Sequence, residues 1–165
     1  MRINLRDIID VPGGSVPFEC ELDTERIASP AIARHRTLPR AEGRVSNTAG
    51  VLTLEGVIRC DMDMICDRCL EEYRLEKDIP VSVPLATELS GEDDSEIYLL
   101  SGEWLELSDV LEMCFILDMD QKSLCRPDCA GLCPDCGKNL NQGPCSCIQS
   151  RDPRMAVLEQ LLDKE

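Results

Sequence analysis

Eight of the eleven cysteines in this chain stand in close pairs, a spacing typical of residues that share a metal ion. Six of the eight fall within residues 124–147, LCRPDCAGLCPDCGKNLNQGPCSC, and the other two belong to an earlier CDRC, residues 66–69. Two cysteines separated by two residues can place both sulfurs on one ion, and a tetrahedral zinc site with four cysteines needs two pairs. The spacing therefore predicts metal binding by thiolates.

The best-formed candidate joins CPDC to the CSC that follows it. Gly137 comes directly after CPDC, and glycine tolerates the positive φ that turns backbone N–H groups toward the thiolates. The CSC pair is tighter than CxxC, but Gly143 and Pro144 beside it favour a turn. We expect a zinc site with four ligands: Cys133, Cys136, Cys145 and Cys147.

The remaining paired cysteines predict a second zinc site, with the ligands Cys66, Cys69, Cys125 and Cys129. Such a site would staple the sheet to the Cys-rich segment, because its two halves are far apart in the sequence. Leu70 follows CDRC where Gly137 follows CPDC, so we expect a weaker turn there. A competing partition remains open, in which one ion is held by Cys125, Cys129, Cys133 and Cys136.

Disulfides and redox-active dithiols are the alternatives to metal binding. The first residues, MRINLRDIIDVPGG, are interrupted by charge and do not resemble a secretion signal, and the apolar runs are too short for a bilayer. We expect a cytoplasmic protein, where thiols stay reduced, and an odd cysteine total argues against a disulfide framework. A redox CxxC is expected at a helix start, whereas turn-forming residues surround these pairs. The three other cysteines, Cys20, Cys60 and Cys114, are expected to be small buried hydrophobes.

Strands are predicted wherever apolar residues alternate with polar ones. Short strands are expected near residues 3–5 and 16–22. Residues 41–47 and 51–66 flank a turn-forming stretch, residues 47–50, and this predicts a hairpin. A further strand over residues 73–85 would place CDRC at a turn between two strands. Pro80 and Pro84 predict that this last strand lies at a sheet edge or end.

Two helices are expected beside the Cys-rich segment. Ser108 is expected to cap the first, residues 109–117, whose apolar side would contain Leu111, Cys114, Phe115 and Ile116. Asp152 and Pro153 predict the start of a second helix, with an apolar stripe made of Met155, Leu158, Leu161 and Leu162.

These elements predict an α+β fold: a mainly antiparallel sheet of short strands with a middle helix, a Cys-rich zinc-finger segment and a C-terminal helix. The length of 165 residues is sufficient for a hydrophobic core. We expect a β-rich core over residues 1–120. Residues 121–165 would form the zinc-binding finger and the C-terminal helix, packed on that core.

The charge distribution limits the partners. The net charge is −15, and twelve acidic residues with no basic one lie between Lys77 and Lys122. This excludes a generally cationic nucleic-acid binder, because phosphate neutralisation supplies most non-specific affinity. The local candidate for RNA contact is a basic patch made of Arg34, His35, Arg36, Arg40 and Arg44. The acidic run is the candidate surface for a basic ribosomal or RNA-processing protein.

Catalysis is not expected from these residues. His35 is the one histidine, and between two arginines it is expected to be a surface residue. A zinc ion with four cysteine ligands leaves no position for water. Aromatic residues are also scarce, which argues against a platform that stacks bases. No small-molecule substrate and no membrane association are expected.

The combination of CDRCLE after a hairpin, CRPDCAGLCPDCGKNLNQGPCSC and the helix start DPR resembles the YceD family, over residues 41–162. Members of that family are described as large ribosomal RNA subunit accumulation proteins. The resemblance implies a bacterial, cytoplasmic, non-enzymatic factor that supports the accumulation or processing of large-subunit ribosomal RNA. The alternative is a zinc-stabilised adaptor that recruits a basic ribosomal or RNA-processing protein.

Overall fold

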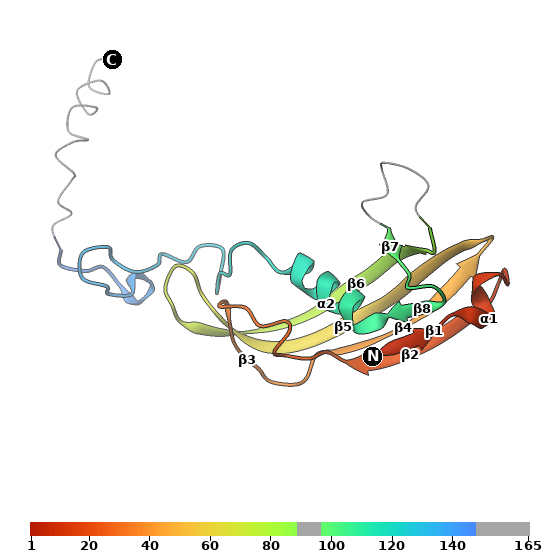
Figure 1. Ribbon diagram of the computed structural model, residues 1–165. Coiled ribbons are helices and arrows are strands. Elements are labelled where there is room, and N and C mark those ends of the chain that lie inside the picture. The colour runs from red at the N-terminus through yellow and green to blue at the C-terminus, as the bar shows by residue number, and fades with distance from the viewer. Residues whose placement is uncertain (89–96, 148–165) are drawn as a thin grey trace, which may run out of the picture.

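The computed structural model describes residues 1–88 and 97–147, which form a mixed α+β fold that is mostly sheet (Figure 1). The helix expected from Asp152 onward lies outside the described residues, as does part of the acidic run, residues 92–96. Within the described ranges, no helix is long and apolar enough to cross a membrane.

Eight strands and two α-helices make up the described chain, in the order β1 (Arg2–Asn4), α1 (Arg6–Ile9), β2 (Ser15–Glu21), β3 (Ile32–His35), β4 (Arg40–Thr48), β5 (Val51–Ile65), β6 (Glu72–Ala86), β7 (Tyr98–Leu99), β8 (Trp104–Glu106) and α2 (Leu107–Asp118). A short 3-10 helix, η1 (Leu140–Gln142), follows in the Cys-rich segment. The main sheet has the order β2-β4-β5-β6-β7, β3 also pairs with β5, and β1 and β8 form a separate ladder.

The predicted hairpin is present and joins β4 to β5. Thr48 pairs with Val51, and Ala49 and Gly50 between them both have positive φ, 55° and 91°. Two successive residues with positive φ give the turn whose twist matches that of paired strands. The residues of this turn therefore favour the pairing of β4 with β5.

A ribbon of two long strands, β5 and β6, extends from the sheet to the Cys-rich segment (Figure 1). The strands pair without interruption from Leu52 with Leu85 to Ile65 with Glu72, and CDRC forms the turn at the far end. On its other side, β6 pairs only with β7 in the described chain, at Leu85 and Ala86. Pro80 therefore lies where β6 is an edge strand, as its missing N–H requires.

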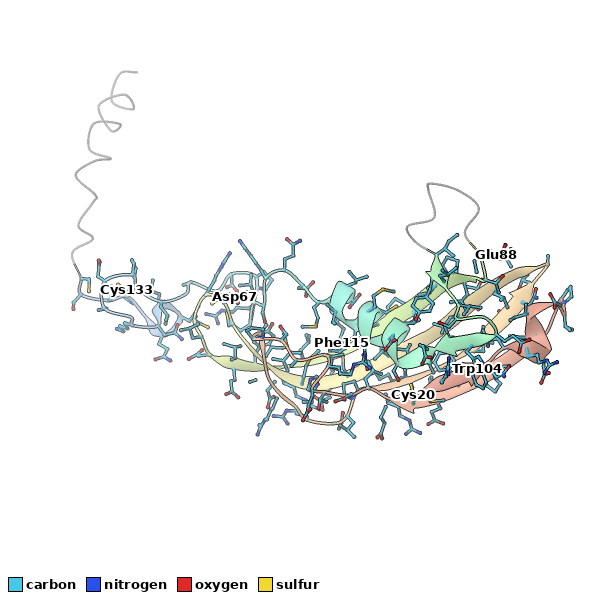
Figure 2. The ribbon with its side chains drawn as sticks, viewed as in Figure 1. Cys20, Asp67, Glu88, Trp104, Phe115 and Cys133 are labelled. Carbon is cyan, nitrogen blue, oxygen red and sulfur yellow. The ribbon has the colours of Figure 1, made fainter. Side chains whose placement is uncertain are left out.

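One hydrophobic core lies between the sheet and α2, whose buried residues are Leu107, Val110, Leu111, Glu112 and Phe115. Figure 2 shows Phe115 between α2 and the strands. The expected cap at Ser108 is wrong: α2 begins at Leu107, and the Ser108 hydroxyl accepts a hydrogen bond from the N-terminal ammonium of Met1. Ile116 is also not part of the apolar inner side, because 54% of it is exposed.

The sheet is closely packed where Gly43 of β4 pairs with Gly56 of β5. The Phe18 ring lies over both glycines, and a Cβ on Gly43 would stand 2.2 Å from the carbonyl oxygen of Glu55. Glycine at this position is therefore required by the approach of two backbones and an aromatic ring.

Candidate metal centres

Two clusters of four cysteines lie one after the other at the CDRC end of the β5–β6 ribbon, which is the end away from Trp104 (Figure 2). The proximal cluster contains Cys66, Cys69, Cys125 and Cys129, and the distal cluster contains Cys133, Cys136, Cys145 and Cys147. In each cluster the four Sγ atoms lie within 4.8 Å of one another. The folding of the chain thus brings together the two sets of four predicted from the sequence, rather than the competing set from residues 125–136.

The distances between sulfurs fit a shared ion better than disulfide bonds. In the proximal cluster, the Sγ atoms of Cys66 and Cys129 are 3.8 Å apart and those of Cys69 and Cys125 are 3.7 Å apart. In the distal cluster, Cys133 and Cys145 have their Sγ atoms 3.4 Å apart. Zn–S bonds of about 2.3 Å in a tetrahedron set neighbouring sulfurs about 3.8 Å apart, whereas a disulfide needs about 2.05 Å. The donor set and its spacing therefore fit zinc.

The two CxxC turns have the same backbone hydrogen bonds. The N–H of Cys66 donates to the carbonyl of Glu71 at 3.0 Å, and the N–H of Leu70 donates to the carbonyl of Cys66 at 2.9 Å. The corresponding bonds from Cys133 to Lys138 and from Gly137 to Cys133 measure 2.8 and 2.9 Å.

Leu70 adopts a φ of 59°, close to the 73° of Gly137. The two turns therefore have the same geometry, but leucine takes the glycine conformation at a cost of about 1–2 kcal/mol, so a weaker turn at CDRC stays a prediction.

The proximal cluster is largely buried and is fastened to the ribbon by polar contacts. Cys66, Cys69 and Cys129 are each at most 3% exposed. The N–H of Asp67 donates to the carbonyl of Ser123 at 2.8 Å, and the Ser123 N–H donates to an Asp67 carboxylate oxygen at 2.7 Å. This reciprocal pair joins the turn of the ribbon to the segment that carries the other two cysteines.

Two further contacts strengthen this junction. The hydroxyls of Tyr73 and Ser123 share a hydrogen bond of 2.8 Å. A guanidinium nitrogen of Arg68 donates to the carbonyl of Cys129 at 2.9 Å. Sequence reasoning did not single out Ser123 or Tyr73, because each acts only through residues about fifty positions away.

Asn141 connects the two clusters, and the sequence carried no signal for it. It lies in η1, inside the loop that closes the distal cluster, yet its Nδ2 donates to the Sγ of Cys129 in the proximal cluster at 3.3 Å. The orientation of its amide is fixed because Oδ1 accepts from the N–H of Ala130 at 2.8 Å and from Arg126 at 2.6 Å. Nδ2 also donates to Asn139 at 2.8 Å, so the side chain is fully hydrogen-bonded.

The surroundings of both clusters favour thiolates. Burial alone would raise the pKa of the Cys66 thiol, but hydrogen bonds from the backbone N–H groups of Cys125, Cys69 and Arg68 outweigh it and lower that pKa to about 6. Backbone hydrogen bonds from Cys136 and Asp135 lower the pKa of Cys133 to about 7.

Other thiols in the clusters resist ionisation. The pKa of Cys125 is raised to about 12, first by burial and then by the neighbouring sulfurs. The pKa of Cys147 is also raised to about 12, first by its contact with Cys136. Four sulfurs this close cannot all be negative without a cation, so a divalent ion would complete each cluster.

The clusters differ in exposure. In the distal cluster Cys133 is buried, Cys136 is exposed, and Cys145 and Cys147 are partly buried. The distal cluster is thus the more accessible of the two to solvent.

The predicted basic patch is largely paired with carboxylates, with three of them beside its four arginines. Arg34 and Arg36 both bind the carboxylate of Asp63, at 2.5 and 2.6 Å. Arg40 pairs with Glu19, and Arg44 lies 3.8 Å from Glu55 across the β4–β5 ladder. The patch is therefore a set of ion pairs and not a free cationic surface.

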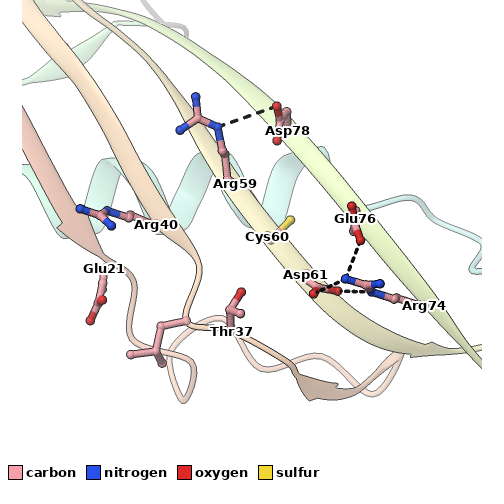
Figure 3. A pocket seen from close by; sticks show the side chains of 10 residues that line it. Glu21, Thr37, Arg40, Arg59, Cys60, Asp61, Arg74, Glu76 and Asp78 are labelled. Carbon is pink, nitrogen blue, oxygen red and sulfur yellow. Dashed lines mark hydrogen bonds and ion pairs between the residues drawn. The ribbon is translucent and has the colours of Figure 1, made fainter.

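The adjoining hollow on the sheet has the same character (Figure 3). Its lining includes Arg40, Arg59 and Arg74, and the Arg74 guanidinium reaches Asp61 at 2.8 Å and Glu76 at 2.5 Å. The lining holds more carboxylates than arginines, so its net charge does not attract phosphate.

His35 is not the surface residue expected from its neighbours. Its two ring nitrogens are buried without a hydrogen-bond partner in the described chain, and burial lowers the pKa of the imidazole. The ring lies 6.3 Å from that of Phe115, centre to centre. His35 thus belongs to the packing between β3 and α2.

Comparison with known proteins identifies relatives of this chain. A relative in Mycobacterium bovis and two in strains of Mycobacterium tuberculosis, all named as uncharacterized proteins, are each 28% identical over 126 residues. Each match covers 74% of this chain but only 61% of the relative. No solved structure matches.

The family profile described as "Large ribosomal RNA subunit accumulation protein YceD" matches residues 54–162, from near the start of β5 through both clusters. The match covers more than half of the chain. The chain therefore belongs to the YceD family.

Proposed function

We propose that this protein is a non-enzymatic, cytoplasmic factor of ribosome biogenesis that supports the accumulation or processing of large-subunit ribosomal RNA. The family membership carries this proposal, because the family is described by that role. A bacterial setting is supported by the mycobacterial relatives.

We further propose that each cluster holds one structural zinc ion, so that the chain binds two. The observation that carries this step is the pair of clusters with four sulfurs each, which offer soft ligands in the number and spacing that zinc requires. A zinc ion bound by four cysteines has no open position for water, so its role would be to hold the Cys-rich segment rigid.

The contact with the ribosomal target is proposed to run through a basic protein. The pairing of the patch supports this over direct RNA contact, because each of its four arginines has a carboxylate within 4.0 Å and the three carboxylates offset most of its positive charge. An acidic chain with a net charge of −15 attracts basic ribosomal or processing proteins and repels phosphate.

Depletion of the protein tests the biological role. We expect the ratio of mature large-subunit to small-subunit ribosomal RNA to fall and to recover with the wild-type chain. An unchanged ratio would refute the role.

Complementation with Arg40→Gln/Arg44→Gln separates the two modes of contact. These arginines are exposed on the sheet, whereas a change of Arg34 and Arg36 would also leave the buried Asp63 without partners. Full complementation by the double variant is expected for protein contact, and loss of complementation by a folded variant would indicate RNA contact.

A further inference from the structure

The outer side of α2 carries an apolar ridge that the core does not use. The ridge consists of Met113, Ile116 and Leu117, which are 40%, 54% and 76% exposed. These positions are three and four residues apart, so they lie along one strip of the helix, opposite the buried strip that faces the sheet. Ile116 therefore belongs to this outer strip and not to the inner apolar side, where the sequence had placed it.

Hollows flank the ridge on both sides. One of about 490 Å³ lies between α2 and β6, and Ile79, Pro80, Val83 and Pro84 contribute to its lining. The other, of about 340 Å³, adjoins Arg26 on the opposite side of the helix. A ridge between two hollows is a shape that an apolar helix face can pack against.

The charged residues around the ridge are mostly acidic, and the nearby cations already bind carboxylates. The two hollows are lined by the carboxylates of Asp109, Glu112 and Asp118 and by one guanidinium, that of Arg26, which gives three negative charges against one positive. Arg26 binds Asp109 and Glu112 at 2.9 and 3.0 Å. Lys77, beside the first hollow, binds Asp118 at 2.6 Å. The rim therefore retains net negative charge and offers a partner no free cation among the described residues.

We propose that this ridge, Met113, Ile116 and Leu117, is a docking surface for an amphipathic helix of a partner protein whose apolar face is bordered by lysine or arginine. The acidic rim would attract such a helix and the ridge would bury its apolar residues.

A helix fits the site better than an added strand, because Pro80 and Pro84 on β6 cannot donate hydrogen bonds to a new strand. A second copy of the chain is disfavoured by a net charge of −15 on each molecule. The chain's own residues 148–165 carry three basic and four acidic side chains, so they lack the positive charge that the rim favours.

This surface extends the adaptor role proposed above but does not depend on zinc. Zinc content and ribosomal RNA levels report on that role, whereas peptide binding reports on the ridge. The failure of one is therefore distinguishable from the failure of the other.

The test uses the full chain and a short synthetic helix with leucines on one face and lysines elsewhere. We expect the labelled peptide to bind by fluorescence anisotropy, more weakly as salt rises, and to bind Met113→Ser/Leu117→Ser at least about tenfold more weakly. The matched control is Leu38→Ser/Val51→Ser, which changes two apolar residues of similar exposure, 53% and 58%, that lie outside α2 and line neither hollow, and it should bind as the wild type does. Unchanged melting temperature and zinc content would show that both variants are folded.

Three outcomes would overturn the proposal at the level of the peptide. They are equal binding by the ridge variant, equal binding of a scrambled peptide whose leucines are not on one face, and equal binding of a companion peptide with glutamate in place of lysine. Displacement of the peptide by a single-stranded RNA oligonucleotide would assign the surface to RNA instead.

Two controls address occupancy by the chain itself. Sedimentation as a dimer that the ridge variant dissociates would assign the ridge to a second copy. A gain of about tenfold in peptide affinity in Leu158→Ser/Leu162→Ser would assign it to the chain's own C-terminal residues. Either result would overturn docking of a partner helix, whereas a monomer with unchanged affinity supports it.

Discussion

Removal of the Asn141 side chain should weaken zinc binding in the proximal cluster, although Asn141 lies between two cysteines of the distal cluster in the sequence. The amide donates to the Sγ of Cys129 at 3.3 Å from within the loop that closes the distal cluster. Asn141→Ala deletes this donor and leaves every thiolate in place. We expect the proximal cluster to lose affinity while the distal cluster keeps its own.

Two independent estimates of the magnitude agree. A hydrogen bond to a charged group contributes about 1.5–3 kcal/mol. Loss of a partner that supports a metal ligand typically lowers metal affinity about 10–100-fold, which corresponds to about 1.4–2.7 kcal/mol. Asn141→Asp should cost more, because it places a carboxylate beside a thiolate in a similar volume.

The assay is a chelator competition in which the cysteines released at each chelator concentration are alkylated and identified by mass spectrometry. This readout assigns zinc loss to one cluster or the other. Gln142→Ala is the matched control, since Gln142 lies in the same 3-10 helix but donates to Glu71 at 3.1 Å and has no hydrogen bond to a sulfur among the described residues. Equal affinity loss in both clusters of Asn141→Ala, or a proximal affinity the same as in Gln142→Ala, would refute the reasoning.

Three other predictions address the clusters, the sheet and the ion pairs. Native mass spectrometry should find two zinc ions in the wild type and one in either Cys136→Ser or Cys129→Ser. Only Cys129→Ser should lose amide protection in the CDRC turn. An apo mass for the wild type, with all thiols alkylatable, would contradict this prediction. Gly43→Ala should lower the free energy of unfolding by about 1–3 kcal/mol in denaturant titrations, because the new Cβ would meet backbone at 2.2 and 2.6 Å, whereas Gly50→Ala, with nothing within 4 Å, should show only the cost of its positive φ. Asp63→Asn should be less stable than the wild type at neutral pH, because hydrogen bonds from Arg36 and Arg34 lower the pKa of Asp63 in the folded protein. The stabilisation that the Asp63 carboxylate gives the fold is therefore present above its unfolded-state pKa of about 3.9. It is lost as the pH falls through the lower pKa of the folded state. A deficit in unfolding free energy that stays constant across that acidic range would show that the carboxylate charge is not responsible.

Features encoded by neighbouring residues were predictable from the sequence. The β4–β5 hairpin follows from turn chemistry over four residues, and the position of CDRC between two strands follows from alternation on either side of it. The cysteine sets followed from spacing and from the preference for a staple between distant segments. The hairpin and the distal set needed only local geometry, whereas the proximal set joins distant segments and was one of two partitions that the sequence left open.

Features set by strand register or by tertiary contacts were not predictable. Arg40 meets Glu19, and Arg44 approaches Glu55, only because three strands align, so a run of arginines in sequence became a set of ion pairs. Ser108 lost its capping role to a contact with the chain terminus.

Leu70 shows the limit of residue preference as a guide. Its backbone takes the conformation that glycine prefers because bonds to both sides of the turn hold it there. The conformational preference of leucine predicts an energetic cost at this position but does not predict the backbone conformation that Leu70 adopts.

The unbroken pairing of β5 with β6 fixes the distance between the two ends of the ribbon. Fifteen residues per strand at about 3.3 Å each give a span of about 50 Å between the hairpin turn and the CDRC turn. A body held at the cysteine end and a second body held at the far end of the sheet would be kept at that separation. Two targets closer together or farther apart than the ribbon allows would not be engaged at once, so the strand length itself selects which pairs of surfaces one molecule can bridge.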